Sequence, residues 1–301
     1  MATPLDEFER IARFFAPLAA PEGLGLVDDV AIIPGPAGYE YVLKTDAIVE
    51  SVHYLPGDPP DQVAQKLLRV NLSDLAAKGA APVGYLLMTA LPKARDDAWL
   101  ERFAQGLAAD QKTYGIGLLG GDSVATPGPV TLSLTAIGRV KAGTAVLRRG
   151  ARAGELVFVS GNIGDAALGV LAAKGQDLGV GPVDHAFLVY RYRLPQPRLN
   201  LGARLAGVAS AMMDISDGLV ADLGHLCDVS GVAAVIEAAR VPLSLAAQAA
   251  LAQEPARLQQ ISREAGVAVT AIGRIEAGRG VTVRDAAGAE IAVAVKGYEH
   301  F

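Results

Sequence analysis

Strand-like and helical apolar patterns alternate along most of the chain. Residues 30–33 and 39–44 have the composition of strands around a turn rich in proline and glycine. From residue 60 to 79 the apolar positions recur mostly at every third or fourth residue, which predicts a helix. The order continues with a strand at 83–91, a helix at 96–114, and strands at 116–119 and 130–140. Such alternation is typical of folds in which helices cover a sheet.

The alternation lapses between residues 142 and 154, and the 301-residue length exceeds one typical core. We therefore predict an N-terminal domain over residues 1–141 and a C-terminal domain over residues 142–301. In the second half we expect strands at 156–160, 209–215, 233–237 and 267–275, and a final hairpin of 281–283 with 291–295. We expect helices at 165–174 and 218–230, a helix that ends at 206, and a helix-rich stretch that ends at 266. A polar connection precedes residue 197, and a short amphipathic helix is expected at 5–16.

Composition narrows the class of protein. Apolar residues make up 51% and charged residues 20% of the chain, which is typical of a folded globular protein. The formal net charge of -5 disfavours a nucleic-acid partner. The single cysteine, Cys227, excludes an intramolecular disulfide. No signal peptide and no apolar run of ~18–20 residues is found. We therefore expect a cytoplasmic protein that acts on a small substrate, away from membranes.

Five short segments place aspartates beside small, turn-forming or hydroxylic residues. They are Asp28-Asp29, Thr45-Asp46, Asn71 to Asp74, Gly120 to Ser123 and Asp214 to Gly218. Aspartates at strand ends and glycine turns suggest a shared site for a hard cation such as Mg²⁺, which prefers oxygen ligands. Each segment alone also has a simpler explanation: a solvated pair, the polar stripe of a surface helix, a turn or a helix cap.

Other polar residues are candidates for binding phosphate. Arg148 and Arg149 suit a bidentate phosphate contact, although linker arginines are as readily solvated. His53 follows the Thr45-Asp46 segment, and Ser216 or Asp217 can cap the helix that begins near residue 218. The chain has neither a GxxxxGK[ST] loop nor a GxGxxG fingerprint. The aspartates are therefore expected to bring a phosphate in through metal.

Taken in order, these segments resemble the thiamine-monophosphate kinase family, within the superfamily of aminoimidazole-ribonucleotide synthetase-like ATP-binding proteins. The matching stretches are residues 25–33, 44–53, 70–79, 118–123, 148–155, 160–165, 213–219 and 296–301. The ending Lys-Gly-Tyr-Glu-His-Phe and the His53 segment favour the thiamine branch over its relatives.

The resemblance implies a two-domain aminoimidazole-ribonucleotide synthetase-like fold of class α/β and α+β. The N-terminal α/β domain would carry a dimerising sheet, and the C-terminal domain would be ferredoxin-like α+β, with ATP between them. The implied reaction is direct, Mg²⁺-assisted transfer of the ATP γ-phosphoryl group to thiamine monophosphate, which gives thiamine diphosphate. The implied assembly is a homodimer.

The resemblance also implies a role for particular residues. Several Mg²⁺ ions would be held by Asp29, Thr45, Asp46, Asp74, Asp122, Asp214 and Asp217. ATP would contact Tyr114, Gly121, Asp122, Arg148 and Ser216, and the thiamine phosphate would contact His53 and Tyr298. No catalytic residue is expected beyond the metal cluster, because phosphoryl transfer needs positioning and charge neutralisation more than a protein nucleophile.

One stretch departs from the family pattern. Members carry a Gly-Gly-Glu/Asp-Asp-Tyr-Glu stretch followed by a strand, and its acid helps to recognise the thiamine substrate. Here residues 242–258 run directly into residues 259–266, without that acid or strand. Because loss of a strand exposes backbone groups and apolar surface on its neighbours, we hypothesise that a mobile segment is omitted between about Ala252 and Ser262.

Two alternative functions are weighed against this one. A selenophosphate synthetase-like protein usually relies on a reactive N-terminal cysteine or selenocysteine, and Cys227 lies elsewhere. A catalytically weak nucleotide-binding scaffold would fit the missing acid stretch.

Overall fold

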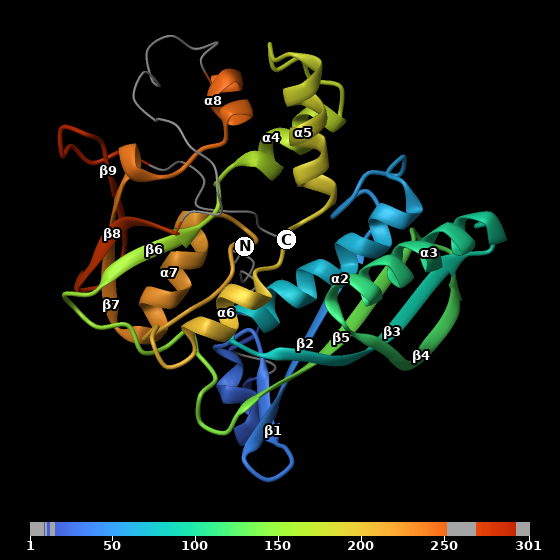
Figure 1. Ribbon diagram of the computed structural model, residues 1–301, viewed down its shortest axis with the longest axis horizontal. Coiled ribbons are helices and arrows are strands. Elements are labelled where there is room, and N and C mark those ends of the chain that lie inside the picture. The colour runs from blue at the N-terminus through green and yellow to red at the C-terminus, as the bar shows by residue number, and fades with distance from the viewer. Residues whose placement is uncertain (1–8, 10, 13–15, 252–268, 293–301) are drawn as a thin grey trace, which may run out of the picture. The chain divides into compact units, whose positions relative to one another are not determined.

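The structure is a computed structural model that describes residues 9, 11–12, 16–251 and 269–292 (Figure 1). The chain forms two compact units. The first is built from residues 1–147 and 193–214, and the second from residues 148–192 and 215–300. Each unit carries its own sheet.

The first unit contains a five-stranded sheet. Its strands are β1 (Ala31–Pro34), β2 (Tyr39–Val49), β3 (Ala81–Pro92), β4 (Gly117–Thr126) and β5 (Thr131–Lys141), in the order β1-β2-β5-β3-β4. β3 and β4 are parallel, and the other neighbours are antiparallel. Gly121 lies where β4 approaches β3 closely, since a Cβ there would lie 1.8 Å from the Leu87 carbonyl oxygen.

Two long helices, α2 (Pro60–Ala77) and α3 (Asp97–Tyr114), cover one face of this sheet (Figure 1). Asp96 caps α3 by accepting a hydrogen bond from the Trp99 amide at 2.9 Å. Gly106 allows the two helices to approach closely, because a Cβ there would lie 2.1 Å from the Asp61 carbonyl oxygen. The short helix α6 (Leu199–Leu205) also packs against α2. The 3-10 helices η2 (Ala16–Leu18) and η3 (Pro21–Leu26) precede the sheet.

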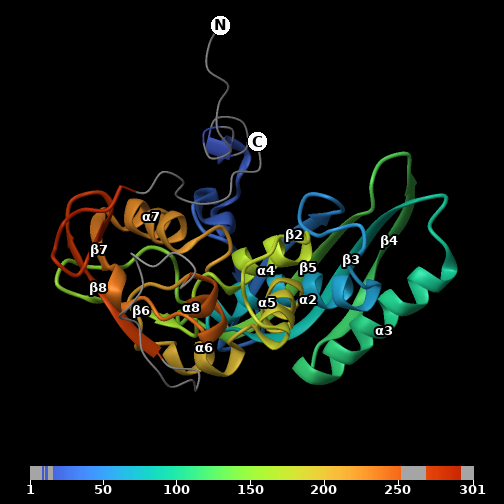
Figure 2. The same cartoon turned by 90° about the horizontal axis from the view of Figure 1, so that it is seen from above.

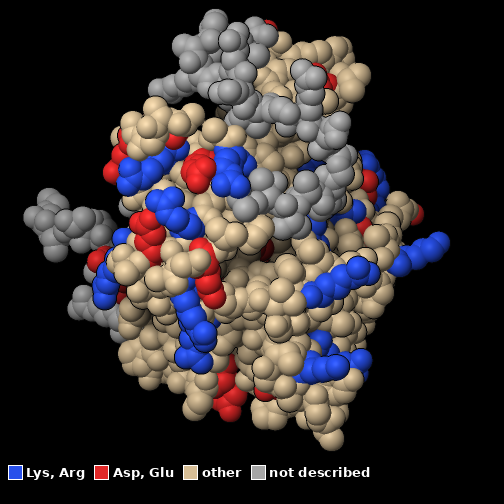
Figure 3. Space-filling model, turned by 60° about the vertical axis from the view of Figure 1, so that its left-hand side comes forward, with Lys and Arg blue, Asp and Glu red and all other residues tan. Residues whose placement is uncertain are grey.

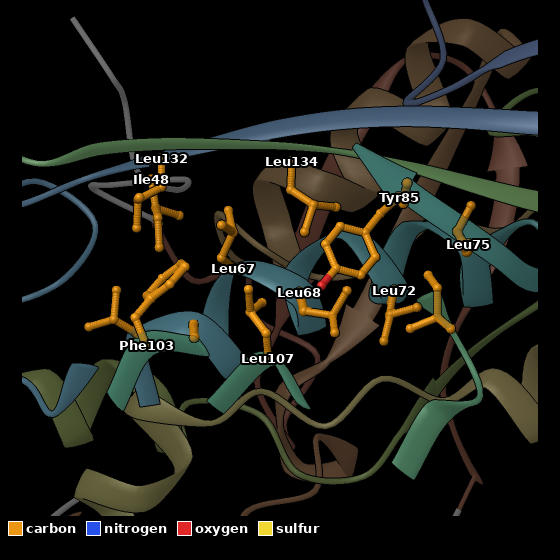
Figure 4. Packing of buried hydrophobic residues seen from close by; sticks show 14 of the residues in the cluster. Ile48, Leu67, Leu68, Leu72, Leu75, Tyr85, Phe103, Leu107, Leu132 and Leu134 are labelled. Atoms are coloured by element: carbon orange, nitrogen blue, oxygen red, sulfur yellow. The ribbon is translucent and has the colours of Figure 1, made fainter. Parts of the chain in front are cut away.

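The core of the first unit lies between α2, α3 and the sheet (Figure 4). Most of the α2 stripe predicted by the spacing of its apolar residues is buried, and Leu67, Leu68 and Leu72 are fully buried. Leu132 and Leu134 of β5 face this stripe, and the residues between them are more exposed. The alternation along β5 therefore assigns one sheet face to the core.

The opposite face of the sheet carries exposed apolar side chains. The β3–β5 register pairs Leu86 with Thr135, and Leu134, the neighbour of Thr135, lies in the core. Leu86 is 45% exposed, and Val124 on β4 is 46% exposed. This face is mixed: threonine and serine side chains of β5 lie beside the apolar residues of β3.

The second unit contains a four-stranded sheet of order β6-β8-β7-β9. Figure 2 labels β6, β7 and β8 of this sheet. Its strands are β6 (Leu156–Ser160), β7 (Val232–Glu237), β8 (Val269–Ala277) and β9 (Gly280–Arg284). β7 is antiparallel to β8 and parallel to β9. Its helices are α4 (Asp165–Ala173), α5 (Pro182–Arg193), α7 (Leu219–Ser230) and α8 (Leu245–Leu251), with the 3-10 helix η4 (Ala238–Arg240).

The structure corrects four of the predicted elements. Thr45 and Asp46 lie within β2 and not at its end, because β5 pairs with all eleven β2 residues. Gly120 to Ser123 likewise continue β4 and form no turn. Residues 209–215 form no strand; the Met212 amide donates to Leu147 and its carbonyl accepts from Lys78, outside any sheet. The connection expected before residue 197 contains α5.

Three predictions lie wholly or largely outside the described residues. They are the helix at 5–16, the 291–295 strand of the last hairpin, and the hypothesis of an omitted segment between Ala252 and Ser262.

Candidate metal centre

Three aspartates from separate parts of the first unit converge. Asp29 precedes β1, Asp74 lies in the last turns of α2, and Asp214 follows α6. Each offers one carboxylate oxygen, and these oxygens all lie within 4.8 Å of one another. The structure thus brings together three of the seven metal ligands that the family resemblance implies.

The helix α2 directs its polar residues inward near its C-terminal end. Asp74 is 3% exposed and Asn71 is fully buried. The Asn71 side-chain amide donates to the Leu67 carbonyl oxygen at 2.9 Å, so part of its polar group is satisfied by its own helix. The alternative explanation of this segment as the polar stripe of a surface helix is therefore wrong.

Burial and mutual repulsion disfavour the charged forms of Asp74 and Asp214 in this cluster. Burial raises the pKa of Asp74 well above its usual value, and the nearby Asp214 carboxylate raises it further. The pKa of Asp214 is also raised, first by burial and then by Asp29. A divalent cation between these groups would remove their mutual repulsion. The all-oxygen donor set fits Mg²⁺, which favours carboxylate and water ligands.

Two lysines with largely buried side chains, Lys44 and Lys78, lie beside the cluster, and neither was predicted to be functional from the sequence. The Lys44 ammonium lies 3.3 Å from Asp46 and 3.2 Å from Asp74. Burial would lower the pKa of Lys44, but the carboxylates of Asp74, Asp46 and Asp29 outweigh it and raise this pKa. The sequence contained a signal for the contact between Lys44 and Asp46. They are two residues apart, and residues at that spacing share one face of a strand.

The second lysine, Lys78, ends α2 and has a fully buried side chain. Its ammonium lies 2.9 Å from Asp28 and 3.3 Å from Asp29, and it donates to the Met212 carbonyl oxygen at 3.4 Å. It therefore joins the end of α2 to the Asp28-Asp29 segment and to the chain that leads to Asp214. The signal in the sequence was a lysine directly after the apolar end of the helix, Leu75-Ala76-Ala77.

Two predicted ligands in the same unit lie apart from the cluster. Thr45 is paired with Thr135 on the face opposite α2, and the two hydroxyl oxygens lie 3.0 Å apart. Asp122 is on the edge strand β4, three strands from β2, and accepts from the Ser123 amide. Three strand spacings correspond to about 14 Å. The side chains of Thr45 and Asp122 therefore do not join Asp74 within one chain.

The predicted nucleotide and substrate residues of the first unit are spread over three elements. His53 follows β2, where its Nδ1 accepts from the Val49 amide at 3.0 Å and its carbonyl oxygen accepts from Lys66. Tyr114 ends α3, with the Arg69 guanidinium 5.7 Å from its ring centre. Gly121 lies within β4.

The remaining predicted residues belong to the second unit or lie outside the described chain. Arg148 accepts through its carbonyl oxygen from the Ser230 hydroxyl. Neither Ser216 nor Asp217 caps α7; instead the Ser216 and Gly218 amides donate to the Asp222 carboxylate. Asp222, which the sequence analysis missed, thus organises this loop from inside the helix. Tyr298 lies outside the described residues.

The chain is similar to known proteins over most of its length. Residues 27–140 match the family model of the AIR synthase related protein, N-terminal domain. The chain is 46% identical over 260 residues to the thiamine-monophosphate kinase of Caulobacter vibrioides, covering 86% of this chain and 73% of that one. It is 37% identical to the Haemophilus influenzae enzyme of the same name, covering 80% and 73% of the two chains.

Solved structures agree with the sequence relatives. A structure of AaThiL complexed with AMPPCP and TMP has a TM-score of 0.86 and 29% identity, and covers 100% of this chain and 99% of that chain. The thiamine-monophosphate kinase of Stenotrophomonas maltophilia K279a has a TM-score of 0.72 and 35% identity, and covers 85% and 89%. None of the helices in the described part of the chain is both long and apolar enough to cross a membrane. By sequence identity and coverage, the chain belongs to the thiamine-monophosphate kinase family.

Proposed function

We propose that this chain transfers the γ-phosphoryl group of ATP to the phosphate of thiamine monophosphate and so produces thiamine diphosphate. The observation that carries the proposal is the group of Asp29, Asp74 and Asp214, whose oxygens lie within 4.8 Å of one another in a chain 46% identical to a named thiamine-monophosphate kinase. The relative solved with AMPPCP and TMP supports both substrates.

The acid cluster suits Mg²⁺ bound with a nucleotide. Asp29, Asp74 and Asp214 would hold Mg²⁺, with Asp46 beside them, and the metal would supply charge neutralisation for the polyphosphate. The chain contributes rigid placement, because α2 and the strand β2 position Asp74 and Asp46 against one core. The acceptor phosphate is already ionised near neutral pH, so the transfer requires neither a covalent intermediate nor a dedicated general base.

The other assignments rest on the family resemblance. Thr45, Asp122 and Asp217 are proposed as additional metal ligands, Tyr114, Gly121, Arg148 and Ser216 as ATP contacts, and His53 and Tyr298 as thiamine-phosphate contacts. On the face shown in Figure 3, the basic and acidic side chains of the described residues stand in small separate groups.

We also propose that the chain acts as a homodimer in the cytoplasm. The open face of the first sheet supports a dimer, because Leu86 and Val124 are exposed there. A second copy of the same face would remove this apolar surface from water.

The reaction is tested by incubating the chain with ATP, Mg²⁺ and thiamine monophosphate and separating the products. Thiamine diphosphate should form in step with ADP. A correctly folded protein that forms no thiamine diphosphate would contradict the proposal.

The metal assignment is tested with Asp214→Ala and Asp122→Ala. Both substitutions are expected to lower turnover steeply and to leave the circular dichroism spectrum unchanged, because each removes a proposed ligand without changing the core. Asp61, a partly exposed α2 residue paired with Arg102, provides the control: Asp61→Ala should retain activity. Wild-type turnover in Asp214→Ala would exclude the buried cluster as the metal site.

A further inference from the structure

The Lys44 side chain already supplies a cation between Asp74, an acid of the cluster, and the neighbouring Asp46. Its Nζ lies 3.3 Å from an Asp46 oxygen and 3.2 Å from an Asp74 oxygen. The Lys44 side chain is only 14% exposed, and that of Asp74 is 5% exposed. The ammonium is therefore held inside the cluster and is not a solvated surface charge.

The sheet register keeps Lys44 in this place. Lys44 pairs with Ala136 and Asp46 pairs with Leu134, and both partners are fully buried on the α2 face. The lysine stem thus crosses the core side of the sheet toward Asp74 on α2. Lys44 is fixed by a strand, and Asp74 is fixed by a helix that packs on that strand.

An ammonium and a divalent ion compete for the space between Asp46 and Asp74. Mg²⁺ requires ligand oxygens at about 2.0–2.1 Å and a nearly octahedral shell. The ammonium instead makes contacts at 3.2 and 3.3 Å. The ion pairs of Lys44 with the described residues go to Asp46 and Asp74, and one oxygen each of Asp29, Asp74 and Asp214 lies within 4.8 Å of the others.

We propose that the Lys44 ammonium takes the place of one divalent ion in this cluster, so that the chain binds fewer metal ions than its acids alone would hold. This inference rests on the proposed function, because it presumes that Mg²⁺ binds at Asp29, Asp74 and Asp214. Lys44 acts as a positioning residue: its ammonium pairs with Asp46 and with one oxygen of Asp74, while Asp29 and Asp214 remain for metal together with the shared Asp74 carboxylate.

Lys78 does not have the same role. Its ammonium contacts Asp28, Asp29 and the Met212 carbonyl oxygen, and its side chain is fully buried. Lys78 links three backbone segments. Among the described residues, the polar contacts of the Lys44 ammonium are with the carboxylates of Asp46 and Asp74. Removal of Lys44 is therefore expected to open a cation position without separating those segments.

The test counts bound ions in the full-length chain. Equilibrium dialysis with Mn²⁺ alone, read by electron paramagnetic resonance, is performed on the wild type, Lys44→Met and Lys141→Met. Lys141 is an exposed residue at the end of β5 and is the matched control. Lys44→Met is expected to bind one more ion per chain than the wild type, and Lys141→Met the same number. The melting temperature of Lys44→Met should also rise more steeply with Mg²⁺ concentration.

The outcomes separate this inference from the proposed function. An equal ion count in Lys44→Met and the wild type would overturn the role of Lys44 and leave the metal site intact. Absence of bound Mn²⁺ from all three proteins would overturn the metal site and the inference together. If Lys44→Met folds poorly without metal, Mg²⁺ should restore its folding, whereas NaCl of equal ionic strength should not. The same rescue is measured with Lys44→Gln. If Mg²⁺ rescues neither variant, the inference is overturned.

Discussion

At the scale of single residues, the first unit is characterised by charges that are buried in pairs. Lys78, Asp28 and Asp29 form one group, and Arg69 with Asp110 forms another. A buried charge is tolerated only when a partner and hydrogen bonds compensate for its lost hydration. The sequence identified the acids because they stand beside turn-forming residues. It did not identify the lysines, because a lysine near the end of a helix or strand is usually solvated.

Lys66 gives a pH-dependent prediction. Burial lowers the pKa of Lys66 to about 8, and nearby Arg193 lowers it while Asp58 opposes the shift. The unfolded chain keeps the ordinary value of 10.5, so between these two values the unfolded state binds more protons than the folded state. The free energy of unfolding contributed by Lys66 should therefore rise as the pH increases from about 8 to about 10.

This dependence is measured by urea denaturation at a series of pH values, with Lys66→Met as the comparison. The difference between the two proteins isolates the lysine from other groups that titrate in the same range. If both proteins show the same pH dependence, the pKa of Lys66 is not lowered in the folded protein.

At the scale of elements, α2 and α3 are joined by two ion pairs of different burial. Arg69 on α2 and Asp110 on α3 form a buried pair, with nitrogen–oxygen distances of 2.6 and 2.9 Å. Gln65 also donates to Asp110 at 2.9 Å. Asp61 on α2 and Arg102 on α3 form a second pair, whose side chains are 36% and 55% exposed.

Asp110→Ala should lower the free energy of unfolding by about 3–5 kcal/mol, because it leaves the Arg69 guanidinium buried without its carboxylate. Asp61→Ala, which breaks the exposed pair between the same helices, should cost about 0–1 kcal/mol. Both values are measured by urea denaturation. Equal losses in the two variants would show that burial does not distinguish these pairs.

The elements also show which patterns carry enough information. The apolar spacing predicted a helix at 60–79, and α2 spans Pro60–Ala77, because its buried stripe is long and regular. The mixed composition of α5 lacks such a stripe, so it was predicted as a connection. The length of β2 is set by its pairing with β5, which lies about ninety residues further along the chain. A local sequence pattern carries no information about this pairing.

At the scale of the whole molecule, the open face of the first sheet predicts self-association. Leu86→Asp should convert the proposed dimer to monomer, because it places a charge within the apolar surface that the second copy would cover. Val208→Asp, at an apolar residue that is 77% exposed outside the sheet, is the control and should leave the assembly unchanged. Sedimentation velocity gives the mass of each protein. A wild type that sediments as a monomer would contradict the dimer.

The sequence by itself determined the alternation of helices and strands, the buried stripe of α2, and an ordered set of aspartates that resembles one enzyme family. These follow from local periodicity and from residue types at short spacing. Only the tertiary structure decided which acids meet. The register of β2 places Asp46 toward α2 and Thr45 away from it, and sheet order places Asp122 at the far edge. Burial then joined Lys44 to Asp74, because a carboxylate removed from water requires a cation beside it.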